Sequence, residues 1–234
     1  MNICILLPYK ENFSPSYPGA VSLFVNSTSN ISKYKNNITV YGNTQLKEKF
    51  SQNYINIPLT KNTLFKSQSK EYVNKFGTLI KSKRIDILEI HNRPNYIKLI
   101  KNINTKIVLY FHNDPLSMIG SKKADERKNL LIVCEKIIFN SEWSKKRFLK
   151  NLDGIYSKSL KLEVIHQSIN KEKVNIKKKI RLITFVGKLN SAKGYDLFGN
   201  SIIKILNKYK NWKSIVIGDE PREKLIFKHK NLKI

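Results

Sequence analysis

Two lysines and two glycines gather in one short loop, residues 187–194, and their types suit the binding of a phosphate group. The residues just before it, 183–186, are apolar or β-branched and predict a buried parallel strand. Gly187 ends this strand, and Lys188 and Lys193 follow before a helical apolar pattern begins. A strand, a basic glycine loop and a helix N-terminus bring N–H groups and positive charge to one anion. The predicted ligand is a diphosphate; the alternative is that two lysines in one loop reflect a lysine-rich chain.

Polar side chains also follow two other predicted strands, residues 85–90 and 106–111. His91 follows the first strand directly, and His112 follows the second. Open α/β sheets bind ligands beyond the carboxyl ends of their strands, so both histidines are candidate site residues. The alternative for a lone histidine is a core or capping role, in which it bonds to the backbone. The same two loops supply four further candidates: Asn92, Arg93, Asn113 and Asp114.

A third candidate loop lies near the N-terminus. Residues 3–7 predict a strand, a proline-rich loop follows, and Gly19 precedes a predicted helix that begins at Ala20. This order is typical of the opening of a Rossmann-type unit. The alternative interpretation of Gly19 is an ordinary turn before a helix. Because no G-x-G-x-x-G is present, neither a nicotinamide nor a flavin cofactor is predicted.

Positive charge dominates the composition. The 234 residues include 44 Lys and Arg against 17 Asp and Glu, which gives a net charge of +27. Such a surface attracts polyanions, so nucleic acids, anionic lipid head groups and acidic glycans all fit. The alternative is compositional, because lysine, asparagine and isoleucine are abundant throughout and the charge is spread along the chain. No specific nucleic-acid motif is found, whereas a uniform excess would still favour an anionic membrane surface.

The spacing of cysteine and histidine and the length of the apolar runs exclude further classes of protein. Cys4 and Cys134 lie far apart in apolar-patterned segments, which predicts buried thiols in a reducing compartment. The four histidines and two cysteines lack metal-ligand spacing, so no metal site is predicted. No apolar stretch approaches the ~18 residues that span a bilayer, and no basic region precedes the apolar N-terminal run. The sequence therefore predicts a cytoplasmic protein.

Several of these segments together resemble glycosyltransferase family 4. G-K-L-x-x-x-K-G at 187–194 and I-V-I-G-D-E-P at 215–221 resemble the start of its second domain. The strings D-I-L-E-I-H-N-R-P-N-Y at 86–96 and V-L-Y-F-H-N-D-P-L-S-M at 108–118 resemble its acceptor domain. They are similar to a subgroup that acts in lipopolysaccharide and cell-surface polysaccharide assembly. I-I-F-N-S-E-W at 137–143 extends the resemblance, which covers nearly the whole chain.

The resemblance implies a fold and a set of site residues. The fold is α/β of the GT-B type, and the implied reaction is sugar transfer with retention from a nucleotide-diphosphate sugar. The implied catalytic residue is His112, near the transferred sugar. Lys188, Lys193, Gly19 and Gly218 are implied to bind the donor and its phosphates. The family usually has Arg at position 188, and a lysine there keeps the charge but loses the bidentate fork.

Domain boundaries follow from the same comparison. We predict an N-terminal Rossmann-like acceptor-side domain at residues 1–170, a linker at 171–180 and an incomplete nucleotide-sugar-binding domain at 181–234. A Rossmann-like domain needs ~100–150 residues, and the family's E-x7-E donor element has no match here. We therefore expect a longer natural protein, or a partial gene, and only two strands in the second domain.

The predicted function is an enzyme of bacterial envelope polysaccharide or lipopolysaccharide synthesis. It would transfer a sugar to a glycan or a lipid-linked acceptor, in the cytoplasm or peripherally on the inner membrane. No cofactor is expected beyond the nucleotide-sugar substrate, and the absence of D-x-D argues against the metal-dependent class. Two alternatives stay open: an inactive fragment that binds acceptor only, and a basic polyanion-binding protein.

Overall fold

The computed structural model describes residues 1–234 except 52, 60–66, 101–103, 169–172, 174–178 and 221–222. The chain divides into two compact units, Met1–Asn170 and Lys171–Ile234, and each is described here by itself. Most of the predicted linker, residues 171–180, lies outside the described residues.

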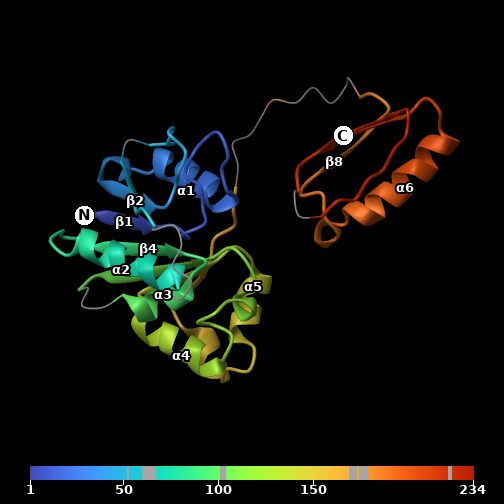
Figure 1. The fold of residues 1–234 in the computed structure, drawn as a ribbon. Helices are drawn as coiled ribbons and strands as arrows, with labels where there is room; N and C mark the ends of the chain where they lie inside the picture. The colour runs from blue at the N-terminus through green and yellow to red at the C-terminus, as the bar shows by residue number, and fades with distance from the viewer. Residues whose placement is uncertain (52, 60–66, 101–103, 169–172, 174–178, 221–222) are drawn as a thin grey trace. The chain divides into compact units, whose positions relative to one another are not determined.

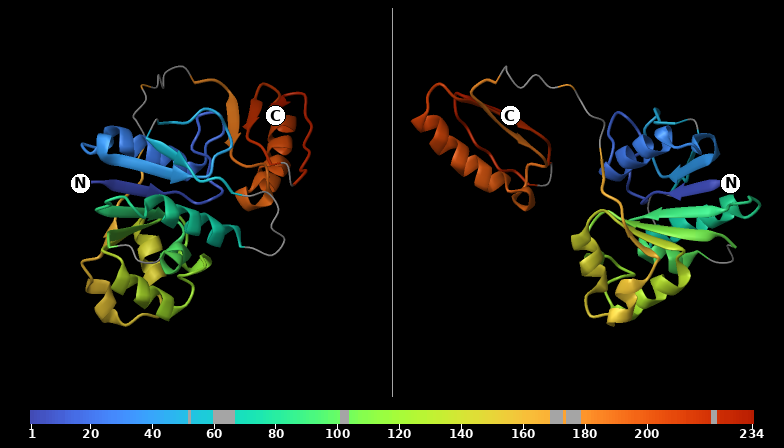
Figure 2. Two further views of the ribbon diagram at one scale, coloured as in Figure 1. Left: turned by 60° about the vertical axis from the view of Figure 1, so that its left-hand side comes forward. Right: turned by 180° about the vertical axis from the view of Figure 1, so that it is seen from behind.

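A seven-stranded parallel sheet forms the centre of the first unit (Figures 1 and 2). Its strand order is β3-β2-β1-β4-β5-β6-β7, the doubly wound order in which a ligand site lies beyond the strand ends. The strands are β1 (Ile3–Leu6), β2 (Ile38–Gly42), β3 (Tyr54–Asn56), β4 (Ile87–His91), β5 (Lys106–Phe111), β6 (Lys136–Phe139) and β7 (Leu162–Val164).

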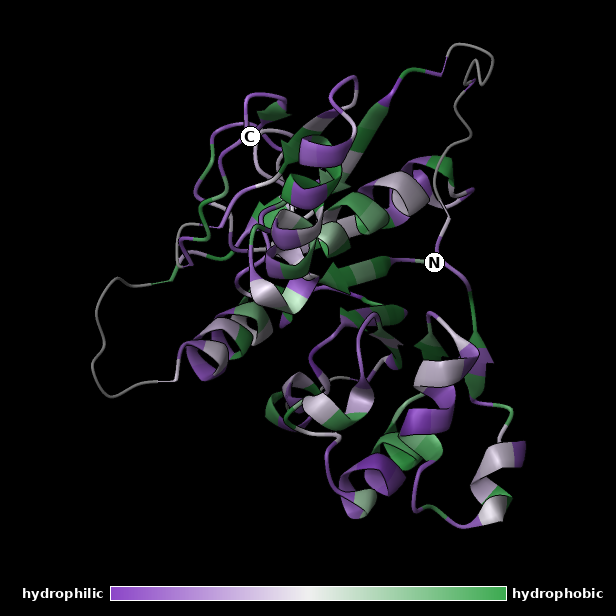
Figure 3. Ribbon diagram, turned by 90° about the vertical axis from the view of Figure 1, so that its right-hand side faces the viewer, coloured by the Kyte–Doolittle hydropathy of each residue, from purple (hydrophilic) through white to green (hydrophobic). Residues whose placement is uncertain are grey.

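Successive side chains of β1 enter two different cores, because neighbouring residues of a strand point to opposite faces of the sheet. Cys4 and Leu6 belong to the larger core, on the side of α2 to α5, whereas Ile5 and Leu7 pack with α1. In Figure 3 the strands are mostly hydrophobic, whereas hydrophilic and hydrophobic residues alternate along the helices. Both faces of the central strands are therefore covered, as a parallel sheet requires.

The helices of the first unit include the one predicted to begin at Ala20. Ser141 before Glu142 is the sequence pattern of a helix N-cap, and Ser141 accepts a hydrogen bond from Ser144 N and so caps α5. Apolar residues at helical spacing predict a further helix at 64–81; it begins at Gln68, and residues 64–66 lie outside the described part. The helices are α1 (Ala20–Ile31), α2 (Gln68–Ile80), α3 (Pro94–Leu99), α4 (Ala124–Val133), α5 (Glu142–Leu149) and the short η1 (Lys35–Asn37), η2 (Pro115–Ser117) and η3 (Gly154–Lys158).

The second unit has three parallel strands, in the order β10-β9-β8, and not the two that the sequence predicts. The missed strand, β10, has two residues, too few to show an alternating pattern. Residues 225–227 read as a short amphipathic segment in the sequence; they form no helix or strand, but the Phe227 ring lies directly against Gly199 of α6. The elements are β8 (Leu182–Val186), η4 (Ser191–Lys193), α6 (Tyr195–Lys208), β9 (Lys213–Ile217) and β10 (Leu232–Lys233).

Leu109 is fully buried in the central strand β5, so truncating it tests the core of the first unit. Leu109→Ala removes buried methyl groups and leaves a cavity, so the free energy of unfolding should fall by about 2–5 kcal/mol. The matched control is Leu160→Ala, because Leu160 is 90% exposed, and it should change stability by about 0.5 kcal/mol or less. Urea denaturation measures both, and equal losses would contradict the assigned core.

Candidate active site

His91 and His112 meet at the carboxyl edge of the first sheet, the edge at which its strands end. His91 is the last residue of β4, and His112 directly follows β5. The two rings stack with centroids 5.0 Å apart, and His91 Nδ1 lies 2.7 Å from His112 Nε2. Tyr110 stacks on both rings, at 5.5 Å from His91 and 4.6 Å from His112.

A carboxylate at one end sets the direction of every hydrogen bond in this group. Glu89 Oε1 lies 2.6 Å from His91 Nε2, and a carboxylate oxygen accepts, so Nε2 of His91 carries the proton. His91 Nδ1 is then an acceptor and takes the proton of His112 Nε2–H. The remaining nitrogen, His112 Nδ1, is the acceptor for the amide N–H of Gln167. We refer to Glu89, His91, His112 and Gln167 as the polar chain.

Burial keeps the His112 ring in its neutral form. His91 is fully buried, and Phe24 of α1 lies edge-on to both histidine rings. The pKa of His112 is lowered from 6.5 to about 3, mainly by burial and to a smaller extent by its electrostatic interaction with His91. An uncharged His112 therefore presents Nδ1 as a hydrogen-bond acceptor, and its present partner, Gln167, is exposed.

Three asparagines fix the backbone around His112. Asn92, in the left-handed region at φ 52°, accepts the His112 N–H through Oδ1 at 2.8 Å and donates to Asn113 Oδ1 at 3.2 Å. Asn140, at the end of β6, donates to the His112 carbonyl at 2.8 Å. Asn92 is buried, so it holds the loop in place, whereas Asn113 is exposed beside the histidines.

The charged members of the two predicted loops are engaged within the protein. Asp114 caps η2 by accepting from Leu116 N, and Arg147 donates to both of its carboxylate oxygens at 2.8–3.2 Å. The Arg147 hydrogen bonds lower the pKa of Asp114. Arg93 Nη1 donates to the Asn92 carbonyl at 2.7 Å. Both charged side chains thus shape the loops beside His112.

A carboxylate lies at the predicted glycine loop of the first unit. Gly19 precedes α1, and Glu11 Oε1 accepts from Ser22 N at 3.0 Å, near the start of that helix. A Cβ at position 19 would occupy the place of the Glu11 carboxylate, so a side chain there would displace Glu11. A phosphate at this helix start would have to displace Glu11.

The basic loop of the second unit also has carboxylate neighbours. Asn190 accepts from Lys193 N at 3.1 Å and donates to Glu220 at 2.9 Å. Ser191 donates to Glu223 through both its N–H, at 3.2 Å, and its hydroxyl. Two carboxylates therefore satisfy polar groups of the loop in which the sequence predicts a diphosphate.

The remaining donor-side candidates lie in and next to this loop. Neither Lys188 nor Lys193 is paired with a carboxylate in the described part of the chain. Gly218 follows β9, and the Gly187 carbonyl lies so close that any side chain at position 218 would collide with it. Lys188 lies two residues after β8, Gly218 directly follows β9, and Lys193 lies in η4, farther along the loop.

Four residues of the site were not predicted: Glu89, Gln167, Tyr110 and Phe24. Glu89 could have been found, because it precedes His91 by two residues and so lies on the same face of β4. It is also the one charged residue of that strand. Phe24 and Gln167 are far from the histidines in sequence, and no local pattern marks either.

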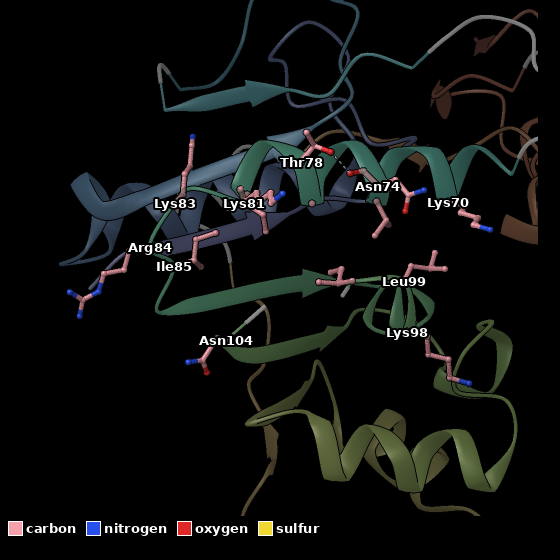
Figure 4. A pocket seen from close by; sticks show the side chains of 14 residues that line it. Lys70, Asn74, Thr78, Lys81, Lys83, Arg84, Ile85, Lys98, Leu99 and Asn104 are labelled. Carbon is pink, nitrogen blue, oxygen red and sulfur yellow. Dashed lines mark hydrogen bonds between the residues drawn. The ribbon is translucent and has the colours of Figure 1, made fainter. Parts of the chain in front are cut away.

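A cavity of about 860 Å³ lies along α2, between this helix and the end of α3 (Figure 4). Over the described residues, no cluster of three or more His, Cys, Asp and Glu side chains could hold a metal ion. None of the helices described has both the length and the apolar character needed to span a bilayer.

Comparison with known proteins identifies the fold. No family model and no curated protein matches the chain. A glycosyltransferase from Rickettsia africae matches with 16% identity and a TM-score of 0.58, over 95% of this chain and 62% of that one. Starch synthase IV from Arabidopsis thaliana matches with 11% identity and a TM-score of 0.62, over 94% of this chain and 69% of that one. The lipopolysaccharide outer core galactosyltransferase WaaB matches with 15% identity and a TM-score of 0.59, over 94% of this chain and 62% of that one.

These likenesses confirm the predicted α/β fold of the GT-B type. The matches also include a putative UDP-N-acetylglucosamine 2-epimerase from Listeria monocytogenes. The fold alone therefore does not assign the reaction. The chain spans 62% to 69% of the three solved glycosyltransferase structures it matches.

The lowered pKa of His112 predicts how its ring responds to acid. Because the folded pKa, about 3, lies below the ordinary value of 6.5, the unfolded chain binds this proton more readily. The contribution of His112 to the free energy of unfolding is therefore fully present above pH 6.5, and it is lost as the pH falls from 6.5 toward 3. The His112 Cε1–H resonance, assigned by loss in His112→Gln, should not titrate between about pH 5 and 8. An inflection near the ordinary histidine pKa would contradict this environment.

Proposed function

We propose that the protein transfers a sugar, with retention, from a nucleotide-diphosphate sugar to a hydroxyl group of a glycan or lipid-linked acceptor. The observation that carries this proposal is the neutral His112, held at the carboxyl edge of a GT-B-type sheet with Nδ1 as an acceptor. The solved structures that share the fold include several glycosyltransferases, and this supports transfer chemistry.

His112 would contact a sugar hydroxyl in place of Gln167. An amide N–H and a sugar O–H make the same kind of hydrogen bond to Nδ1, so the exchange leaves no buried acceptor unpaired. Glu89 and His91 would act by positioning, since they fix which nitrogen of His112 accepts. A fixed acceptor can orient the transferred sugar with little reorganisation during the reaction.

The lysines of the second unit would bind the diphosphate. As the bond from the anomeric carbon to the diphosphate oxygen breaks, a bond to the acceptor oxygen forms, and the hydroxyl proton leaves with the diphosphate. Negative charge then grows on the phosphates, where Lys188 and Lys193 would stabilise it. Gly218 would allow close backbone approach beside them. Binding of phosphate near Gly19 would require Glu11 to move.

The acceptor would bind beside the histidines. Asn113 is the exposed candidate there, whereas His91, Asn92, Arg93 and Asp114 would shape that loop surface. WaaB, one of the similar structures, acts on the lipopolysaccharide outer core, and this supports an acceptor of the bacterial envelope. The net charge of +27 would favour a cytoplasmic location close to an anionic membrane surface.

A second candidate is epimerisation of a nucleotide sugar, which the similarity to a 2-epimerase favours. The two candidates differ in their products. Transfer releases a nucleoside diphosphate and lengthens an acceptor, whereas epimerisation returns an altered nucleotide sugar. Simple polyanion binding would give neither product.

Turnover of nucleotide sugars tests the proposal directly. The protein is incubated with UDP-, ADP- and GDP-sugars and with envelope glycans, and the products are followed by mass spectrometry. We expect nucleoside diphosphate release coupled to acceptor growth. An altered nucleotide sugar, or no turnover of any donor, would overturn the proposed transfer.

Two variants assign the roles of the two units in this reaction. His112→Ala should lower kcat by about 10²-fold or more, because it removes the fixed acceptor. Lys193→Ala should weaken nucleoside diphosphate binding by about tenfold, because one cation on the phosphates is lost. Lys204→Gln removes an exposed charge of α6 and serves as the matched control, with no change expected. If it reduced binding as much as Lys193→Ala, general charge and not a site would be responsible.

A further inference from the structure

A groove lies along one side of α2, on the face of the first sheet opposite the polar chain. The cavity of about 860 Å³ lies between α2, the end of α3 and the segments that lead into β4 and β5 (Figure 4). Its size is typical of ligand pockets. Arg84 and Ile85 precede β4 and Asn104 precedes β5, so one end of the groove is at the amino ends of these strands, whereas Lys98 of α3 lies toward their carboxyl ends (Figure 4). His112 is at the carboxyl end of β5, about 20 Å along the strand from its amino end.

Among the described residues that line the groove, five are cationic and none is acidic. They form two groups: Lys81, Lys83 and Arg84 lie toward one end, and Lys70 and Lys98 lie toward the other (Figure 4). Lys70 and Lys81 have no carboxylate partner among the described residues. Both ends of the groove therefore carry positive charge.

Helical spacing places four of the lining residues in one row. Lys70, Asn74, Gly77 and Lys81 follow at intervals of four, three and four residues, so they share one side of α2. The two lysines are about 16 Å apart along the helix axis. Among the described lining residues, those between the two groups are uncharged, and Asn74 is exposed there, whereas Asn104 is exposed toward the Lys81 end (Figure 4).

Gly77 lies between the two basic groups and has no side chain to fill the groove there. Glycine inside a helix is less favourable than alanine, so a packing reason would be expected for it. Here a Cβ would meet no atom within 4 Å, so neither a close neighbour nor an unusual backbone angle requires glycine. What the glycine does is leave the groove open between its two basic ends.

We propose that this groove binds a linear acidic oligosaccharide, with carboxylate or phosphate groups at the two basic ends and uncharged sugar units between them. The side-chain amides of Asn74 and Asn104 suit sugar hydroxyls, because an amide both donates and accepts. No aromatic side chain is found among the described residues that line the groove, so these residues offer no stacking surface of the kind that single-stranded nucleic-acid sites use. This inference does not depend on the proposed transfer reaction.

The test is a calorimetric titration of the whole chain with tetragalacturonate, an acidic tetrasaccharide. We expect it to bind and neutral maltotetraose not to bind. Gly77→Leu should abolish binding by filling the groove, while the better helix propensity of leucine preserves the fold, checked by circular dichroism. Lys70→Gln and Lys81→Gln should each weaken binding about tenfold. Gly77→Ala should leave binding unchanged and raise the melting temperature.

The matched control for charge is Lys204→Gln, in the second unit, which should bind as the wild type does. The proposal fails if Gly77→Leu or both lysine variants bind as tightly as the wild type. It also fails if Lys204→Gln weakens binding equally, which would indicate general attraction by a basic chain. Tighter binding of oligothymidylate through the same lysines would assign the groove to nucleic acid instead. None of these readouts involves sugar transfer.

Discussion

Parallel pairing of β4 with β5 is the constraint on which the candidate site depends. The register places His91 opposite Tyr110, so His112 comes next to His91 where both strands end. A slip of one residue would turn His91 to the opposite face of the sheet, away from His112. The pairing is held by aliphatic residues, among them Leu88, Ile90 and Leu109, that are fully buried against α2 to α5. Core packing on one face thus positions the chemistry on the other.

The hydrogen bonds of the polar chain define which nitrogen of His112 carries the proton. Glu89 accepts from His91, so each later hydrogen bond has one direction, and His112 is left with Nδ1 as an acceptor. Burial under Phe24 disfavours a charged imidazole. His112 is therefore suited to orient a hydroxyl, and it is a weak proton acceptor because its pKa is low. This fits a reaction in which the leaving diphosphate takes the proton.

The sequence predicted what depends on spacing along the chain. The parallel strands, the Ser141 cap and the shared edge of His91 and His112 follow from patterns over a few residues. The partners of those residues do not, because they come from distant segments: Arg147 reaches Asp114 from 33 positions away, and Glu11 fills the helix start beside Gly19. Short elements such as β10 show no periodicity at all. The predicted anion loops were recognisable by glycine and lysine, but their carboxylate neighbours were not.

The central claim is that His112 is neutral, with its proton on Nε2. Nitrogen-15 chemical shifts of the imidazole ring distinguish the two neutral tautomers and the charged form. At neutral pH we predict a protonated Nε2 and an unprotonated Nδ1 for His112, and the same tautomer for His91. A proton on His112 Nδ1, or an imidazolium, would contradict the direction of the polar chain and with it the role of His112 as a hydrogen-bond acceptor.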